Sequence, residues 1–302
     1  MPVEDKEIPV LMEPSSRARR GYGLMLSSVL LFSANALVVK AGGAHLGVNG
    51  WEVSFFRSWV GLAILFLLFY RSGRFQPLHL VTNRWLVLRG VVGSLAILIF
   101  YSTVILIDVG RATVLGCTYP LFATLFAVVM LKETFRPGQL AWMALALAGV
   151  ALITGLFQQA WVFNPYEALC LFGAVLAGFV VVVIRKLHSS EHTSTIFGAQ
   201  CFYGLFVTAP VALGTLLALS PAAFGVLVLA GILVAFGQLT MTGAYKDLPV
   251  AKGASTQLLL PVLNALGGMM FFGESYSGLE FLGGALVVYS CYRIIRMRSV
   301  SV

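Results

Sequence analysis

Nine uncharged polar side chains are the strongest candidates for ligand chemistry in this 302-residue chain. All of them lie inside long apolar stretches. A polar group at bilayer depth is costly, so such groups tend to face the interior of a helix bundle. There they can line a cavity for a polar ligand or hydrogen-bond a neighbouring helix. The candidates for substrate binding are Asn35, Tyr101, Thr118, Tyr119, Gln200, Tyr203, Gln238, Gln257 and Asn264.

Arg57 is the cationic candidate in the same stretches. Its planar guanidinium could bind a substrate carboxylate, or its long side chain could extend to the membrane surface. Glu52 lies five residues earlier, too far round a helix for an ideal ion pair. Lys40 ends the first stretch, where we expect it to anchor a helix at the membrane surface.

Acidic and histidine side chains are missing from the middle third of every apolar stretch. A proton-coupled pump usually needs such a group as its relay. We therefore expect downhill transport or substrate exchange. Glu52 and Glu167 remain as interfacial groups through which coupling could run.

The chain also lacks the sequence patterns of catalysis. It has no phosphate-binding glycine loop, no histidine-rich metal cluster and no nucleophile–base pair. Its four cysteines lie in apolar stretches without metal-ligand spacing, which favours small packed side chains over disulfides or a zinc site. We expect no enzymatic activity, no cofactor and no metal.

Pro120 and Pro261 lie 141 positions apart in two matching segments, 108–133 and 249–274. A proline inside a helix removes one backbone hydrogen bond and permits a kink, so both are hinge candidates. The glutamates that end the segments are expected to satisfy nearby backbone or hydroxyl groups. The matched residues are Arg111 with Lys252, Pro120 with Pro261, and Glu133 with Glu274.

Composition places these residues in a membrane protein. The chain is 59% hydrophobic and 11% charged, with a mean hydropathy of +0.92, whereas soluble proteins are roughly a quarter charged. Its apolar runs have the length at which a helix crosses the hydrocarbon core, and backbone groups without water must form helices there. The net charge of +8 comes from residues at the ends of these runs, not from a patch suited to nucleic acid.

We predict an all-α integral membrane protein of ten transmembrane helices with short loops. A polar, flexible cytoplasmic tail, residues 1–21, precedes them and does not resemble a signal peptide. The expected helices cover residues 22–40, 52–70, 87–107, 112–131, 139–157, 166–184, 195–217, 222–243, 250–272 and 278–296.

The distribution of Lys and Arg predicts the orientation. With the N-terminus inside, 17 of the 20 basic residues, Arg89 among them, lie on the cytoplasmic side. Lys40, Arg57 and Arg111 are left for the outer side or the membrane. The opposite orientation would invert this ratio, so both termini are expected in the cytoplasm.

The matching segments predict two five-helix repeats, residues 22–157 and 158–298. Because five is an odd number, the repeats must insert with opposite orientation. Inverted repeats of this kind are typical of secondary transporters, whose substrate sites lie near the bilayer midplane between the halves. We therefore expect alternating access.

Several segments, taken in order, resemble the drug/metabolite transporter superfamily in its EamA-like branch of ten-helix carriers. FSANALVVKAGG at 32–43 resembles the first helix of that family, and FFRSW places Arg57 where the family often has arginine. LRGVVGSLAILIFYSTVIL at 88–106 resembles the third helix, and AGFVVVVIRKL at 177–187 the sixth. The segments ending LKE and FGE resemble the most recognisable portion, and the likeness covers residues 22–298.

The chain departs from the family pattern in two places. The second-half counterpart of Arg57 is Gln200, and the tryptophan often found in the first helix is absent. Members of the superfamily carry very different molecules, so the resemblance leaves the substrate open.

The resulting hypothesis is a secondary transporter for a small polar metabolite, such as an amino acid, acting as exporter, facilitator or exchanger. A neutral cavity of Asn, Gln, Tyr and Thr suits a zwitterion better than a phosphate ester. The alternatives are a transporter of drugs or hydrophobic organic cations, or of organic anions and nucleotide-type substrates. A non-transporting membrane assembly protein and a membrane-embedded enzyme are further alternatives, without a soluble module or a catalytic constellation to favour them.

The expected partners are a small-molecule substrate and the lipid bilayer, and no nucleic acid. A homodimer is compatible with the sequence, although a monomer would suffice. The compact chain suggests a bacterial inner membrane, and a eukaryotic plasma or organelle membrane is also compatible.

Overall fold

The computed structural model describes residues 14–107, 109–134, 137–156, 164–216 and 218–297, and every regular element in these ranges is helical. In chain order the elements are α1 (Pro14–Leu46), α2 (Gly50–Leu65), the π-helical turn η1 (Phe66–Tyr70), α3 (His79–Thr82), α4 (Arg84–Leu106), α5 (Val109–Gly116), α6 (Tyr119–Leu131), α7 (Pro137–Ile153), α8 (Pro165–Leu187), α9 (Thr193–Leu216), α10 (Pro221–Asp247), α11 (Val250–Thr256), the 3-10 turn η3 (Gln257–Leu259), α12 (Leu260–Phe272) and α13 (Gly278–Arg296).

Eight helical segments among the described residues are long and apolar enough to cross a membrane, and α7 is a shorter apolar helix. The predicted all-helical membrane class is therefore confirmed. The count of ten crossings and the side of the termini stay predictions. One boundary of the sequence analysis was wrong: α1 begins at Pro14, so residues 14–21 of the expected flexible tail are helical. Proline suits a first helical turn, where its missing N–H is not needed.

The helix ends follow local sequence chemistry. Asn49 with Glu52 forms a capping box at the start of α2, and Asn164 with Glu167 forms one at the start of α8. Each asparagine side chain accepts a backbone N–H, and each glutamate accepts the N–H of its asparagine, which satisfies donors that a helix start otherwise leaves unpaired. Glu52 and Glu167 thus have structural roles at these helix starts.

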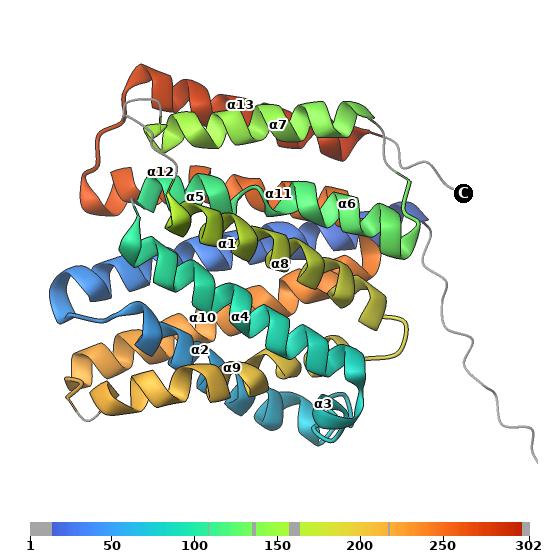
Figure 1. The fold of residues 1–302 in the computed structure, drawn as a ribbon, viewed down its shortest axis with the longest axis vertical. Coiled ribbons are helices and arrows are strands. Elements are labelled where there is room, and N and C mark those ends of the chain that lie inside the picture. Colours follow the sequence, from blue (N-terminus) through green and yellow to red (C-terminus); the bar gives the residue numbers. More distant parts are fainter. Residues whose placement is uncertain (1–13, 108, 135–136, 157–163, 217, 298–302) are drawn as a thin grey trace, which may run out of the picture.

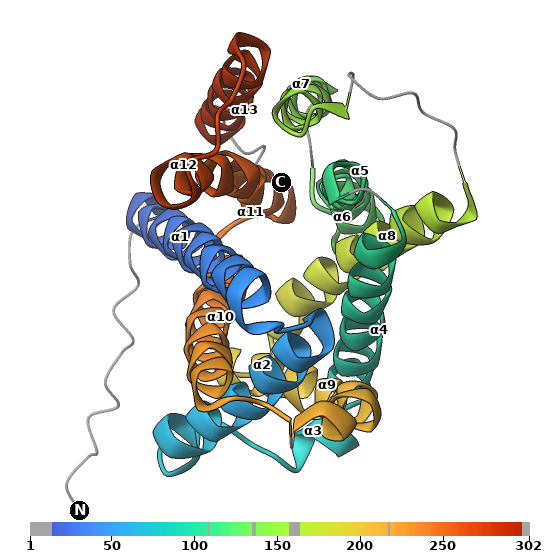
Figure 2. The same ribbon diagram turned by 90° about the vertical axis from the view of Figure 1, so that its left-hand side faces the viewer.

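The helices are stacked in pairs across the molecule (Figure 1). At one end α7 packs on α13, and at the other α2 packs on α9. Seen along the helices, α1, α10, α11 and α12 lie on one side and α4, α5, α6 and α8 on the other (Figure 2). The two sides meet at α2 and α9.

Equivalent helices of the two halves of the chain pack in equivalent pairs. The contact of α1 with α10 corresponds to that of α8 with α4, and the contact of α2 with α10 to that of α9 with α4. In the same way α8 packs on α6 while α1 packs on α12. The tertiary structure therefore has an approximate twofold relation between a first set, α1 to α7, and a second set, α8 to α13.

Glycine permits the closest of these contacts. A Cβ atom on Gly149 of α7 would lie 2.6 Å from the carbonyl oxygen of Gly283 in α13, and one on Gly283 would lie 2.6 Å from the carbonyl oxygen of Gly149. Small residues let helix backbones approach in this way inside membranes. The outward surface is apolar, with Leu67 80% and Phe206 66% exposed, as expected of a lipid-facing belt.

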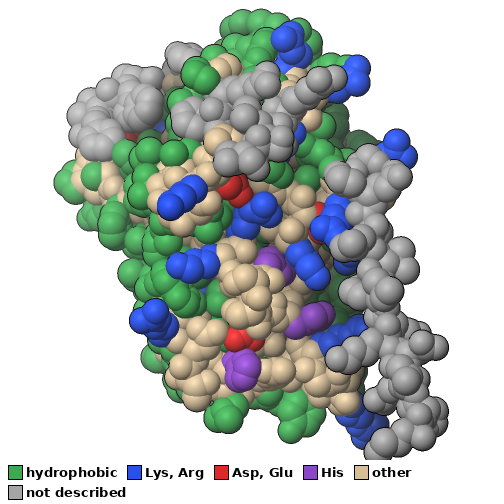
Figure 3. Space-filling view, turned by 90° about the vertical axis from the view of Figure 1, so that its right-hand side faces the viewer, with side chains coloured by type: hydrophobic (Ala, Val, Ile, Leu, Met, Phe, Trp, Pro, Cys, Tyr) green, Lys and Arg blue, Asp and Glu red, His purple; other side chains and the backbone are tan. Residues whose placement is uncertain are grey.

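Lys and Arg side chains gather on the face that holds α3 and the end of α8 (Figure 3). Arg71, Arg74 and Arg84 are exposed on segments at this face, and Lys246 is exposed at the end of α10. We refer to it as the α3 face. This is the face that the sequence analysis assigns to the cytoplasm.

Candidate functional site

The two proline-bearing segments are interrupted helices. α5 ends at Gly116 and α6 begins at Tyr119, so Pro120 lies in the first turn of α6. In the second half η3 separates α11 from α12, and Pro261 lies in the first turn of α12. The structure thus has full interruptions where the sequence analysis expected kinks in continuous helices, because a proline fits a first turn but not a helix interior. Movement at these hinges stays a prediction.

Several predicted site residues face the interrupted helices. The hydroxyl of Tyr119 donates to the carbonyl oxygen of Ala254 in α11, at 3.4 Å. Gln257 donates through Nε2 to the hydroxyl of Ser28 in α1, at 2.7 Å. These bonds connect α6 with α11, and η3 with α1. Sequence reasoning did not single out Ser28.

Asn35 and Asn264 carry amide oxygens that are enclosed and have no hydrogen-bond partner in the described part of the chain. Asn35 belongs to α1 and Asn264 to α12, two helices that pack together. A buried acceptor without a partner costs free energy, on the order of 1–3 kcal/mol. These two oxygens are therefore available to a ligand or to water.

A second group of polar residues joins α2, α4, α9 and α10. Arg57 donates through Nη2 to Oε1 of Gln238 at 3.0 Å, and Arg89 donates through Nη2 to Oε1 of Gln200 at 2.5 Å. Arg89 is 1% exposed, and Gln200 and Gln238 are buried. The charge of Arg57 acts on Arg89, so the two pairs form one cluster. We call these four residues the Arg–Gln cluster.

The four residues of the Arg–Gln cluster are divided between the two halves of the chain. Arg57 on α2 corresponds to Gln200 on α9, because each is the eighth residue of its helix. Each of these arginines of the first half bonds a glutamine of the second half. Both cations therefore come from the first half and both amides from the second.

Two glycines make room for this cluster. A Cβ atom on Gly93 would overlap Nη1 of Arg89, which lies one helical turn earlier on α4. A Cβ atom on Gly204 of α9 would lie 2.6 Å from the hydroxyl oxygen of Ser58 on α2. The guanidinium of Arg89 thus lies in space that only glycine leaves free.

Arg89 is the functional candidate that sequence reasoning missed. It was counted among the residues of the cytoplasmic side, and the structure buries it instead. Counting charges at helix ends cannot distinguish an arginine that reaches water from one that folds inward along its own helix. The available signal was Gly93, four residues later on the same face. Arg57 does not extend toward the surface either, because it bonds Gln238.

The remaining candidates are Thr118, Tyr203 and Tyr101. Thr118 donates to the carbonyl oxygen of Leu115 at 2.6 Å, inside the α5–α6 interruption. Tyr203 donates to the carbonyl oxygen of Leu80 at 3.2 Å, near α3. Tyr101 belongs to α4, and its side chain lies outside the described residues. Thr118 and Tyr203 therefore both bond backbone carbonyl oxygens.

Matched ion pairs close the ends of α6 and α12. Glu133 follows α6 and accepts from Arg185 at the end of α8 and from the backbone N–H of Val250, the latter at 2.9 Å. Arg185 also donates through Nη1 to the carbonyl oxygens of Tyr245 and Leu248, at 2.8 and 2.7 Å. The expected backbone partner of Glu133 is thus present, together with a cation.

Glu274 has the corresponding arrangement after α12. It accepts from Lys40 of α1 and, at 2.8 Å, from the hydroxyl of Tyr276. Lys40, expected to be a surface anchor, is therefore an ion-pair partner. Both glutamates follow a residue in the left-handed conformation, Lys132 with φ 55° and Gly273 with φ 64°. α6 and α12 end on opposite sides of the bundle (Figure 1), so the ion pairs that follow them lie at opposite ends.

The basic residues that begin the matching segments differ in their surroundings. Arg111 pairs with the fully buried Glu167 at the start of α8, at 3.3 Å. Lys252 is buried in α11. The ion pair gives Glu167 a second structural contact beside its capping role at the start of α8.

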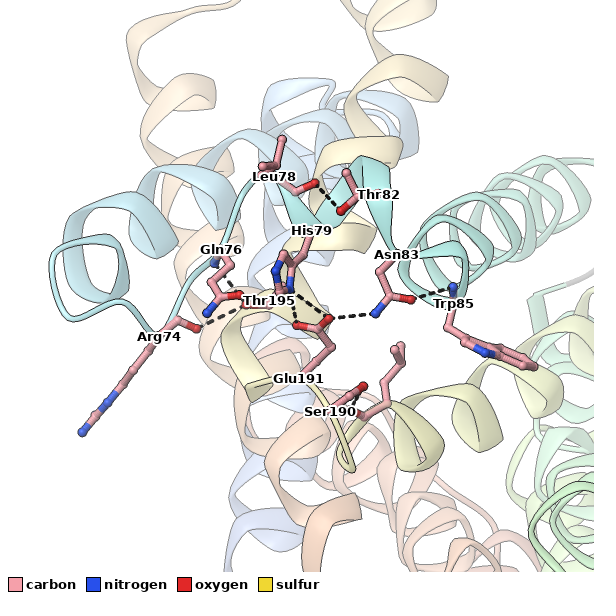
Figure 4. A network of polar contacts seen from close by, with 11 residues as sticks. Arg74, Gln76, Leu78, His79, Thr82, Asn83, Trp85, Ser190, Glu191 and Thr195 are labelled. Carbon is pink, nitrogen blue, oxygen red and sulfur yellow. Dashed lines mark hydrogen bonds and ion pairs between the residues drawn. The ribbon is translucent and has the colours of Figure 1, made fainter.

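A polar network joins the two halves at the α3 face (Figure 4). The carboxylate of Glu191, between α8 and α9, contacts Nδ1 of His79 at 3.1 Å and accepts from Asn83 at 2.7 Å. Thr195 donates to the carbonyl oxygen of Arg74 and accepts from the backbone N–H of Gln76, both at 3.2 Å. This network fixes the segment after η1 to the start of α9.

An apolar groove of about 680 Å³ lies between α2 and α9. Its lining includes Trp59, 47% exposed, and Phe206, 66% exposed, so it opens on the outer surface of the bundle. Such a groove suits lipid chains and not a polar metabolite. The groove is therefore separate from the candidate site.

Sequence comparison finds the same family twice along the chain. A profile described as the EamA-like transporter family matches residues 19–155 and again residues 164–296. The two matches together cover most of the sequence.

Named relatives are transporters of different small molecules. The chain is 29% identical to the pseudopaline exporter CntI of Pseudomonas aeruginosa, over 93% of this chain and 97% of that protein. It is 25% identical to an S-adenosylmethionine uptake transporter of Rickettsia conorii, over 89% of each chain. A riboflavin transporter of Rhizobium johnstonii is 27% identical, over 69% of this chain and 68% of that protein. A crystal structure at 21% identity superposes with a TM-score of 0.71, covering 92% of this chain and 95% of the other, and so shares the fold.

Proposed function

Because this chain belongs to the EamA-like transporter family, we propose that it carries a small polar metabolite across its membrane by alternating access. The resemblance to the drug/metabolite transporter superfamily is confirmed by the family match. The family and the named relatives are transporters of small molecules, not enzymes, and the chain is an integral membrane protein.

The proposed architecture is ten crossings in two inverted repeats, residues 22–157 and 158–298, with both termini in the cytoplasm. The two family matches and the exchange of packed helix pairs between the halves support the repeats. The Lys and Arg residues of the α3 face support a cytoplasmic location for that face.

The observation that supports alternating access is the presence of matched ion pairs at opposite ends of the bundle. We call these two contacts, Glu133 with Arg185 and Glu274 with Lys40, the closures. Glu133 with Arg185 holds α6, α8 and the start of α11 together at the α3 face, and Glu274 with Lys40 holds α12 to α1 at the other. In an inverted repeat each half can adopt the shape of the other. Breaking one closure while the other forms would then expose the centre to each side in turn, with Pro120 and Pro261 as the hinges.

We propose an amino acid or related compound as the substrate, moved by export, facilitated diffusion or exchange. Gln257, Asn35 and Asn264 would supply hydrogen bonds between the halves. The cations of the Arg–Gln cluster favour a second candidate, an organic anion, over a hydrophobic cation. The bacterial relatives support a bacterial inner membrane, and one chain supplies both halves, so we propose a monomer as sufficient.

The test is counterflow in proteoliposomes preloaded with a mixed amino-acid pool, with and without a pH gradient. We expect labelled amino acid to enter without the gradient. Asn264→Ala and Gln257→Ala should slow entry at least roughly fivefold, because each removes a hydrogen bond worth about 1 kcal/mol or more to a polar substrate. Arg71→Gln, on the exposed α3 face, is the matched control and should transport normally.

Two results would overturn parts of this proposal. Entry only with the pH gradient would contradict the expectation of uncoupled transport. Exchange of organic phosphates without any amino acid would remove amino acids as the substrate class.

A further inference from the structure

Arg89 of the Arg–Gln cluster is buried with only part of its hydrogen-bonding capacity used. The guanidinium of Arg89 is enclosed, and its Nε and Nη1 have no hydrogen-bond acceptor among the described residues. Its bond to Gln200 uses Nη2 alone. The described charged group that acts on Arg89 most strongly is another cation, Arg57.

A small cavity adjoins this charge. It is lined by Arg57, Ser54, Ser94 and Gln200, among others, and has room for about one water-sized group, with a volume of about 10 Å³. Ser54 and Ser94 are each 3% exposed, and their hydroxyl oxygens have no partner within the described ranges. A cation, two hydroxyls and an amide therefore meet at one enclosed point.

A purely structural role does not account for this arrangement. Two helices can be joined by one hydrogen bond between neutral amides, without a buried guanidinium group such as that of Arg89. A buried charge without a counter-charge is strongly destabilising, and charged residues inside membrane proteins usually pair or bind a ligand.

We propose that Arg57, Arg89, Ser54 and Ser94 form a binding site for one carboxylate group of the transported molecule. One carboxylate oxygen fits the cavity, where Arg57 and the two serine hydroxyls would bond it, and the second oxygen would bond Arg89, whose partner Gln200 lines the cavity. A phosphate group, with more oxygens, exceeds the space. This inference rests on the proposed transport function for the origin of the carboxylate, and on the cluster alone for the binding of an anion.

The site also connects substrate charge to conformation. Arg57 and Arg89 belong to the first half, and their partners Gln238 and Gln200 belong to the second. A carboxylate bound between them would neutralise charge at the contact of α2 with α9, where the halves meet. Loaded and empty protein would then differ in the electrostatics of the surface along which the halves must move.

The first experiment measures anion binding by thermal unfolding of the purified protein in detergent. Sodium formate is titrated against sodium chloride and against neutral formamide, with ionic strength held by sodium sulfate, whose dianion is too large for the cavity. We expect saturable stabilisation by formate and none by formamide. Stabilisation by chloride alone would overturn the assignment to a carboxylate, and no saturable effect would overturn the site.

Substitutions test whether the stabilisation by formate arises at this site. Arg89→Gln should weaken the formate response at least roughly tenfold, because hydrogen bonds to charged groups contribute about 1.5–3 kcal/mol. Ser94→Ala tests the same site without removing the buried charge, and Gly93→Ala should act like Arg89→Gln by displacing the guanidinium. Arg74→Gln, an exposed arginine of the α3 face, is the matched control. An unchanged response in both Arg89→Gln and Ser94→Ala would overturn the location.

The second experiment separates the site from the transport proposal. In proteoliposomes, counterflow of labelled alanine is competed with unlabelled alanine, alaninamide and lactate. Competition by lactate but not by alaninamide, lost in Ser94→Ala, supports the carboxylate site. Competition by alaninamide alone would overturn it. Transport of no tested compound, with the formate response intact, would contradict the amino-acid proposal and support the anion site.

Discussion

Neighbouring side chains set the ionisation state of Glu274, a loop residue that follows α12. Hydrogen bonds from Lys40 and then Tyr276 lower the pKa of Glu274 below its ordinary value of 4.5. Burial, and then the carboxylate of Glu274, raise the pKa of Tyr276 to about 12. At neutral pH the glutamate is therefore ionised and the tyrosine protonated. The closure at this end keeps its ion pair across the physiological range.

His188 makes the stability of the α3 face depend on pH. Its Nε2 lies 2.7 Å from the carbonyl oxygen of Thr242, and burial, followed by Lys246 and Arg185, lowers its pKa below 6.5 despite that hydrogen bond. The pKa of His192 is lowered too, by burial and by nearby cations. A lowered histidine pKa means that the unfolded chain binds more protons at acidic pH.

We therefore predict that stability is full above about pH 6.5 and falls as the pH drops from there through the lowered pKa of His188. The melting temperature in detergent should decrease between pH 7.5 and 5.5. His188→Gln keeps a donor for Thr242 but cannot titrate, so its decrease should be smaller. His45→Gln, exposed at the end of α1, is the control. Equal pH dependence in wild type and His188→Gln would contradict the assignment.

At the scale of elements, the contact of α7 with α13 depends on two glycines. We predict that Gly149→Ala lowers the unfolding free energy by about 1–3 kcal/mol, because the new methyl overpacks a backbone contact. Gly214→Ala is the matched control: its Cβ would meet nothing within 4 Å, so helix propensity favours alanine by up to about 1 kcal/mol. In thermal unfolding, the melting temperature should fall for Gly149→Ala and rise for Gly214→Ala. If both melting temperatures changed in the same direction, packing would not decide whether a glycine-to-alanine substitution stabilises the protein.

The interruptions before α6 and α12 give a second prediction for elements. Pro120→Ala restores an N–H that can bond the carbonyl of Gly116 and continue the helix from α5. We expect Pro120→Ala and Pro261→Ala each to slow turnover several-fold, on the order of 1 kcal/mol in the barrier, while half-saturating substrate concentrations stay close to wild type.

Counterflow kinetics would measure this, with Pro221→Ala as the control, since Pro221 begins the uninterrupted α10. Wild-type turnover in both hinge variants would remove the prolines from the mechanism.

At the scale of the whole molecule, the two closures should shift the equilibrium between states that are open to opposite sides of the membrane. Weakening one closure should favour the state open at its own end. Glu133→Gln weakens the α3-face closure, and Glu274→Gln the opposite one. Hydrogen–deuterium exchange should rise at residues 245–253 in the first variant and at 272–277 in the second. The first effect should be larger, roughly tenfold in the open population, because hydrogen bonds to a charged group contribute about 1.5–3 kcal/mol. Arg185 and Glu133 are also less exposed than Lys40 and Glu274.

The charge-swapped double variant Lys40→Glu with Glu274→Lys should restore exchange at 272–277. Increased exchange at both ends in each single variant would indicate loss of the fold and not a shift between states.

Much of this architecture is determined by sequence alone. Apolar runs of membrane length force helices, because the backbone has no other partner in lipid. The 141-residue repeat of Pro120 and Pro261 marks the matched interruptions, and the Asn and Glu at 49–52 and 164–167 specify helix starts. These features are local, so they depend on little beyond the neighbouring residues.

Only the tertiary structure determines how side chains from distant helices meet. Arg89 and Gln200 are 111 residues apart, and Arg57 and Gln238 are 181 apart, so their bonds depend on how α2, α4, α9 and α10 pack. Charge counting placed Arg89 near water, and the space over Gly93 allows it to turn inward instead. Inside a membrane protein the cost of burying a charge depends on its partners in space. For that reason the sequence predicts the helices and their order, while packing decides which of their polar groups form a site.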